Sequence, residues 1–289
     1  MTMIDLLHAD CYRLIHGRKF WVGCVVLILC SVGLLAGVIT FISGYDGSVD
    51  ADITAVLTRT LPSHSAMLTY SSMFRGGLVS GVVSLVVALA VSEDRDSGLA
   101  KNIFSSGVGR GRYAVEKLLL ATLLSLWYAL LSIVTLEITF AALRFDYASA
   151  EPVIGWLGFV VVLVLGVAVY ATIAAMAALV TGSGVFSSVV AVGAGFQLVG
   201  GALTGLAGMV PQIGWLQRLV AWLPISNMNM LTDARSMMAE TLPEAARSFL
   251  TGTADLGMPV WAHATVCFVG WLALCWAVTL LVVCRRDPC

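Results

Sequence analysis

The most restrictive feature of this sequence is a series of apolar runs long enough to cross a lipid bilayer. A membrane-spanning helix needs about 20 mainly apolar residues. Because backbone amides and carbonyls cannot stay unpaired in hydrocarbon, such runs must be helical. We therefore predict an all-α, polytopic integral membrane protein with six transmembrane helices. The six runs are Phe20–Ile42, Leu68–Val91, Leu118–Leu143, Pro152–Val180, Val185–Met209 and Val260–Val283.

Composition supports this class and excludes others. Only 11% of the 289 residues are charged and 59% are hydrophobic, whereas a soluble domain carries about a quarter charged residues. The net charge is −1, which gives no electrostatic reason to expect a nucleic-acid partner. None of the seven cysteines falls in a segment predicted to lie outside the cell, so no disulfide framework is expected.

Sequence motifs for catalysis are also missing. The chain contains no G-x-S-x-G, H-E-x-x-H or C-x-x-C pattern and no P-loop. We expect no catalytic residues, no metal site, no cofactor bound by this chain and no enzymatic activity of the chain by itself.

The distribution of Lys and Arg predicts the orientation. With both termini cytoplasmic, ten of the 16 Lys and Arg residues lie on the cytoplasmic side and six outside, as the positive-inside rule requires. We expect one transmembrane domain over residues 1–289. It begins with an amphipathic helix within residues 1–19, and its long outer segments are 43–67 and 211–259, the latter with short helices.

The longest charged insertion between two spans is Ser92–Lys117, SEDRDSGLAKNIFSSGVGRGRYAVEK. Acidic residues open it, Gly98 follows, and Leu99, Ile103 and Phe104 then have the spacing of a short amphipathic helix. Gly107 and Gly109 end that stretch. The segment is either a solvated loop with the usual positive charge or a surface on which a soluble partner docks, and the residues alone leave both open.

One acidic residue lies inside a span. Glu137 is in the third run, where a carboxylate in hydrocarbon costs about 2.5–3.5 kcal/mol. It must face the bundle, be protonated, pair with a residue such as Gln197, or extend to the outer interface. We therefore consider Glu137 and Gln197 as candidates for a substrate path, with anchoring at the interface as the alternative for Glu137.

The order of residues in Ser92–Lys117 resembles the cytoplasmic loop of type-two ABC exporter permeases. The opening acid-Arg-acid-x-Gly, then Lys-Asn, then Ser-Gly-x-x-Arg and Glu-Lys-Leu look closest to the subgroup of lantibiotic-immunity and bacitracin-resistance permeases. The first helix, ending at Lys19-Phe20-Trp21, is similar to that family's elbow helix. Leu223-Pro224 and Ser226 lie where the family carries short outer helices.

The resemblance implies a function. In this family the loop forms a coupling helix that contacts a separate ABC ATPase subunit. ATP and Mg would bind that ATPase, and a second permease copy or a homologous permease would complete a dimer in the bacterial plasma membrane. The cargo would be amphipathic: an antimicrobial peptide, a drug or a lipid. The residues that match the coupling motif are Glu93, Asp94, Arg95, Asp96, Gly98, Lys101, Asn102 and Arg110.

Two other functions remain open. An ion-coupled secondary transporter would use Glu137 and would need discontinuous helices and further charges at mid-membrane. A membrane protein that senses or assembles without transport is the third possibility, and no residue pattern points to it.

Overall fold

The computed structural model describes residues 3–43, 73–142, 153–210, 213–233 and 260–285. All regular elements in these ranges are helices, which confirms the all-α prediction. They are α1 (Met3–His16), α2 (Arg18–Ser43), α5 (Leu78–Asp96), α6 (Leu99–Ser105), α7 (Arg110–Ala142), α8 (Val153–Thr181), α9 (Gly184–Gly195), α10 (Leu198–Met209), α11 (Gly214–Ala221), α12 (Pro224–Asp233) and α15 (Val260–Arg285).

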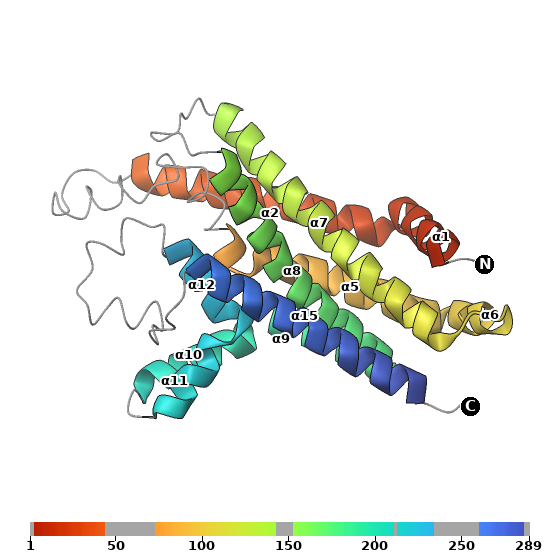
Figure 1. Ribbon diagram of the computed structural model, residues 1–289. Coiled ribbons are helices and arrows are strands. Elements are labelled where there is room, and N and C mark those ends of the chain that lie inside the picture. The colour runs from red at the N-terminus through yellow and green to blue at the C-terminus, as the bar shows by residue number, and fades with distance from the viewer. Residues whose placement is uncertain (1–2, 44–72, 143–152, 211–212, 234–259, 286–289) are drawn as a thin grey trace.

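The long helices form an elongated bundle around α8 (Figure 1). Most side chains of α8 are buried, and the helix packs against α5, α7, α9 and α15. α1, α6 and the end of α15 lie at one end of the bundle, while α10, α11 and α12 lie toward the opposite end (Figure 1). We call these the α6 end and the α12 end.

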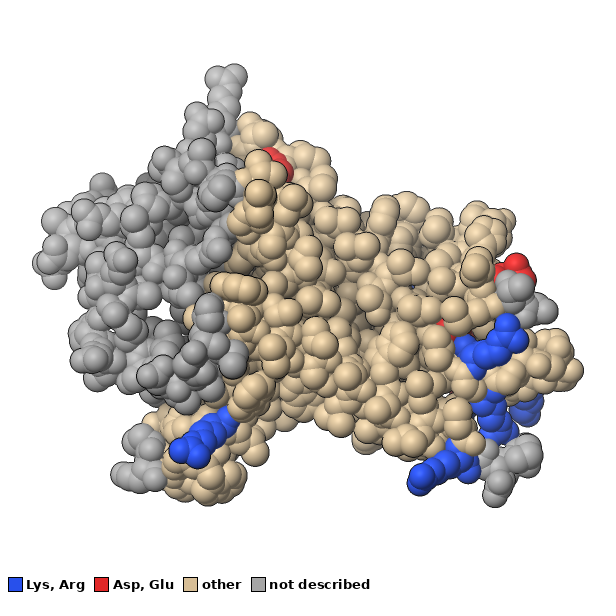
Figure 2. Space-filling model, viewed as in Figure 1, with Lys and Arg blue, Asp and Glu red and all other residues tan. Residues whose placement is uncertain are grey.

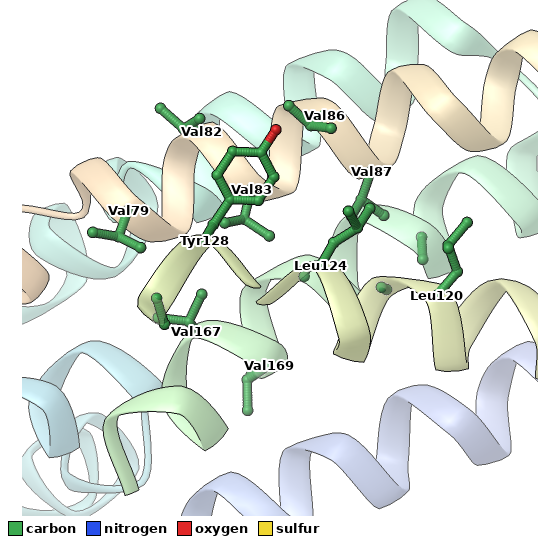
Figure 3. Packing of buried hydrophobic residues seen from close by; sticks show 14 of the residues in the cluster. Val79, Val82, Val83, Val86, Val87, Leu120, Leu124, Tyr128, Val167 and Val169 are labelled. Atoms are coloured by element: carbon green, nitrogen blue, oxygen red, sulfur yellow. The ribbon is translucent and has the colours of Figure 1, made fainter. Parts of the chain in front are cut away.

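The core is built from aliphatic side chains of α5, α7 and α8 (Figure 3). Val83 and Val87 of α5 and Leu124 of α7 are buried, as is Tyr128, whose hydroxyl donates a hydrogen bond to the Phe20 carbonyl of α2 over 2.8 Å. Gly23 of α2 makes room for this contact, because a Cβ there would lie 2.6 Å from the Tyr128 hydroxyl. The close approach of α2 therefore depends on a residue without a side chain.

Several helices have the length and apolarity of membrane spans, so the chain is a membrane protein. Among the described residues three qualify by themselves, α7, α8 and α15, and five spans result if each bent helix pair counts as one. The helix bounds mostly match the predicted runs, but α5 extends to Asp96 and α7 begins at Arg110. Both helices therefore extend beyond their apolar runs, and at the α6 end only α6 and two short turns separate them.

The fifth predicted span is not one continuous helix. α9 and α10 meet at an angle of 46°, because Gln197 between them adopts a left-handed backbone conformation with φ of 60°. Residues at the break form hydrogen bonds with polar groups of neighbouring segments. The Ser80 hydroxyl donates a hydrogen bond to the Gly195 carbonyl over 2.7 Å, and the Gln197 amide donates one to the Phe74 carbonyl over 3.4 Å.

The burial pattern of α1 follows the expected amphipathic helix only in part. Leu7, Cys11 and Leu14 pack against the core, whereas Ile4 and Ile15 are exposed. α1 meets α2 at 62°, and the charged residue Asp10 is buried. The reason is that the α6 end supplies charged partners for Asp10, so this carboxylate faces the bundle.

Charge is distributed unevenly over the surface. On the face shown in Figure 2, Lys and Arg gather at the α6 end, and the middle of the bundle carries almost no charge. At the other end α11 carries Arg218. The predicted outer segment 43–67 lies almost wholly outside the described residues, as does most of segment 211–259, of which α11 and α12 are described.

Candidate functional site

The segment between α5 and α7 folds around two glycines. Gly98 and Gly107, with φ of 74° and 83°, flank the seven-residue helix α6. Both have left-handed backbone conformations that favour glycine. Since a Cβ on either would meet open space, the glycines are needed here for their backbone conformation rather than for packing.

Helix α6 is amphipathic, as its residue spacing suggests. Ala100 and Ile103 are buried, while Lys101 and Asn102 are exposed on the opposite side. Phe104 stacks edge-on against Tyr113 at 5.3 Å between ring centroids, and the Arg110 guanidinium lies 5.7 Å from the Phe104 ring centre. The apolar side thus fixes α6 to α7 and leaves a polar face at the end of the molecule.

Beneath α6 lies a buried charge cluster, defined here as Asp10, Arg13, Asp94, Tyr113, Glu116 and Lys117. Lys117 is its centre: the ammonium forms ion pairs with Asp10 of α1, with Asp94 of α5 over 2.5 Å, and with Glu116 over 3.3 Å. The Lys117 side chain is only 1% exposed and that of Asp94 is 0% exposed. One cation at the start of α7 therefore joins this helix to α1 and to the end of α5.

Arg13 and Tyr113 complete the coordination of the carboxylates. The Arg13 guanidinium pairs with Asp94 and lies 3.2 Å from Asp10. The Tyr113 hydroxyl donates a hydrogen bond to Asp94 over 3.2 Å. Burial alone would lower the pKa of Arg13, but Asp94 and then Asp10 raise it above its ordinary value. The Asp94 carboxylate therefore interacts with Arg13 of α1, with Lys117 of α7 and with the Tyr113 hydroxyl.

Glu116 differs from the other two carboxyl groups. The Lys117 ammonium lies 3.3 Å from one of its oxygens, but among the described residues neither oxygen has a hydrogen-bond partner, although both are buried. It lies in the polar first turns of α7, before the apolar run that begins at Leu118. Burial raises the pKa of Glu116 to about 8, against the lowering effect of Lys117 and with a further raise from Asp10. With Glu116 protonated, the carboxylates of Asp10 and Asp94 face the two cations Arg13 and Lys117.

The other residues of the coupling motif lie on or near the surface. Glu93 accepts a hydrogen bond from Lys19 over 2.8 Å, in a pair that is about half exposed on both sides. The Arg95 guanidinium lies against the turn between α8 and α9. A Cβ added to Gly182 of this turn would be only 1.1 Å from that guanidinium. Asp96 is exposed near the first residue of α9. The end of α5 is thus anchored to α2, α8 and α9.

Glu137 and Gln197 are not brought together. Glu137 is half-buried on α7, whereas the Gln197 side chain is buried at the α9–α10 break and bonds to Phe74. The structure therefore supplies no pairing between the two residues, and each has a separate environment.

Sequence reasoning missed most of the buried cluster. Asp94 was considered as part of the coupling motif, whereas Asp10, Arg13 and Lys117 were not among the candidate residues. One signal was present: Glu116-Lys117 places two charges directly before an apolar run of 26 residues, Leu118–Leu143. Charges so close to hydrocarbon need partners, and the nearest acid-rich segment is the end of α5.

No protein-family model matches the chain, and no curated protein matches it.

Proposed function

We propose that this chain is the membrane-spanning subunit of an ATP-driven exporter, of the type-two ABC permease class. It would have six spans, with the α6 end in the cytoplasm of a bacterial cell. It would work as a dimer with itself or with a related permease, and export an amphipathic peptide, drug or lipid. A separate ATPase subunit would supply the energy by docking on α6.

The observation that carries this proposal is the architecture of the α6 end. A short helix with a free polar face is held between two long helices, α5 and α7, whose other residues form the core of the bundle. Because both helices are packed over most of their length, a push on α6 would move them as rigid rods. Such a layout suits an element that receives mechanical work from a soluble partner.

The buried charge cluster gives this element stiffness. Lys117 and Arg13 tie the end of α5 and the start of α7 to α1. Breaking one partner of a buried ion pair costs about 3–5 kcal/mol, so α1, α5 and α7 should move together at this end. Asp94 itself is fully buried, and its place in the coupling motif is then to hold the loop rather than to contact the ATPase.

The test uses the exposed face of α6. Lys101→Glu and Asn102→Asp change its charge without touching the cluster beneath. We expect both to weaken co-purification with the partner ABC ATPase that this proposal requires, and to lower substrate-stimulated ATP hydrolysis by the complex. Arg285→Glu is the matched control, because Arg285 is an exposed cation at the same end of the bundle but on α15.

Retention of complex and transport in the α6 variants, at the level of Arg285→Glu, would remove the docking claim. A fold defect is recognised separately by the elution volume and thermal unfolding of each purified variant.

Ion-coupled transport is a second candidate, favoured by one observation. The α9–α10 break is a discontinuous helix, a feature of secondary transporters, and Glu137 supplies a carboxyl in a span. If this function is correct, transport continues without any ATPase. Transport stops when the proton gradient is dissipated, and it also stops in the Glu137→Gln variant.

A further inference from the structure

A large groove opens at the α6 end between α2 and α9, with α5 as its floor. The groove is wide and open, and its volume of about 1040 Å³ is slightly above the about 300–1,000 Å³ usual for small-molecule sites. Val185, Val189 and Val192 of α9 and Leu198 of α10 contribute its apolar wall, with exposed fractions of 78%, 64%, 39% and 60%.

The mouth of the groove is charged. Lys19, Glu93 and Asp96 all line it. Lys19 and Glu93 pair with each other at the surface, and among the described residues Asp96 has no ion-pair partner. Since an exposed pair contributes only about 0–1 kcal/mol, both of its members can exchange partners with a ligand at little cost.

We propose that this groove binds an aminophospholipid from the leaflet at the α6 end. The surrounding bilayer supplies such a molecule, and its parts match the groove in order. Acyl chains would lie along the valines of α9, the phosphate would meet the Lys19 ammonium, and the primary amine would meet the carboxylates of Asp96 and Glu93. This assignment goes beyond the proposed function, because it holds whether or not an ATPase docks on α6.

Charge complementarity selects this class of lipid. Two carboxylates and one ammonium leave the mouth with an excess of one negative charge, so an anionic headgroup without an amine is disfavoured. A methylated ammonium would be attracted but would donate no hydrogen bonds to the carboxylates. The expected order of affinity is phosphatidylethanolamine, then phosphatidylcholine, then phosphatidylglycerol.

Native mass spectrometry of the full-length protein in detergent tests the proposal, with each of these three lipids titrated separately. We expect phosphatidylethanolamine to bind about tenfold more tightly than phosphatidylglycerol, the size of one charge-assisted hydrogen bond. Asp96→Asn should remove most of that preference. Val189→Trp should fill the groove and weaken all three lipids, while Val161→Trp, at a similarly exposed valine of α8, should change nothing.

Three results would overturn the proposal. One is equal binding of phosphatidylethanolamine and phosphatidylglycerol by the wild-type chain. Another is equal loss of lipid in Val189→Trp and Val161→Trp. The last is a lipid-free dimer that Val189→Trp converts to a monomer, which would show that a second copy of the chain covers the groove. ATP hydrolysis enters none of these readouts, so the lipid site and the exporter proposal can fail separately.

Discussion

At the scale of single residues, Lys117 carries the most consequential contacts. It is buried and pairs with carboxylates of α1 and α5. Lys117→Met keeps the length of the side chain but leaves Asp10 and Asp94 with one cation, Arg13, between them. We expect this change to destabilise the protein by about 3–5 kcal/mol, the usual cost of an uncompensated buried charge. Thermal or denaturant unfolding in detergent measures the effect.

Lys19→Met is the control for that experiment. It breaks the Lys19–Glu93 pair, whose side chains are 44% and 52% exposed, and should cost no more than about 1 kcal/mol. Similar losses of stability for the two variants would mean that the buried cluster contributes no more than a surface pair.

Glu116 predicts a specific dependence on pH. Its pKa is raised from 4.5 to about 8 in the folded chain, chiefly by burial. The folded state thus holds this proton more tightly than the unfolded state. The contribution of Glu116 to stability is fully present below pH 4.5 and is lost as the pH rises through 8.

Glu116→Gln should remove this dependence. The difference in unfolding temperature between wild type and Glu116→Gln, measured from pH 5 to 9, should fall steadily as the pH rises. A difference that stays constant over this range would show that Glu116 does not titrate there in the folded protein.

Residue-level predictions from sequence succeeded where local chemistry decides the outcome. The glycines that flank α6 were identifiable because only glycine adopts positive φ cheaply. The cluster around Lys117 was not, because Asp10 and Lys117 are 107 positions apart in the sequence and only the packing of three helices brings them together. For the same reason the sequence left open whether Glu137 pairs with Gln197, whose side-chain amide donates a hydrogen bond to the Phe74 carbonyl in the structure.

At the scale of helices, close packing between α5 and α9 depends on small residues. A Cβ on Gly195 would lie 2.9 Å from the Gly81 Cα, a backbone atom that cannot rotate away. Gly195→Ala should therefore force α5 and α9 apart and cost about 1–3 kcal/mol, as overpacking usually does. Unfolding in detergent gives the measurement.

Gly205→Ala is the matched control on α10, where a Cβ would meet open space. It should be neutral or slightly stabilising, because alanine favours a helix over glycine by up to about 1 kcal/mol. If both alanine variants have the stability of the wild type, the small-residue contact is not required for packing.

The helix-packing motifs in the sequence were only partly informative. Three G-x-x-x-G patterns occur within the predicted spans, and the pair Gly77 and Gly81 does pack tightly, against Phe196 and Gln197. Gly33 and Gly205, from the other two patterns, face open space. The spacing of the glycines identifies a helix face that allows close packing. Which helix packs against that face depends on the arrangement of the whole bundle. The sequence analysis missed the break at Gln197 because the apolar run Val185–Met209 reads as one continuous span.

At the scale of the whole molecule, polarity is divided between two ends and an apolar middle. The α6 end holds α1, α6 and the end of α15 (Figure 1), together with the buried charge cluster and the groove lined by Lys19, Glu93 and Asp96. Apolar run length predicts helical class and membrane character well, since both follow from hydrogen bonding in hydrocarbon. The length of the apolar runs does not indicate which soluble partner binds at the polar α6 end.

The most direct measurement of the central claim is a photo-crosslink from α6 to the ATPase. A photo-reactive amino acid replaces Asn102 on the exposed face of α6, or Trp215 on α11 as a control near the opposite end. We predict a crosslinked product with the ATPase from position 102, strengthened by trapping the ATPase in its ATP-bound state, and none from position 215. No crosslink from position 102 in a complex that co-purifies, or equal crosslinks from both positions, would contradict the account.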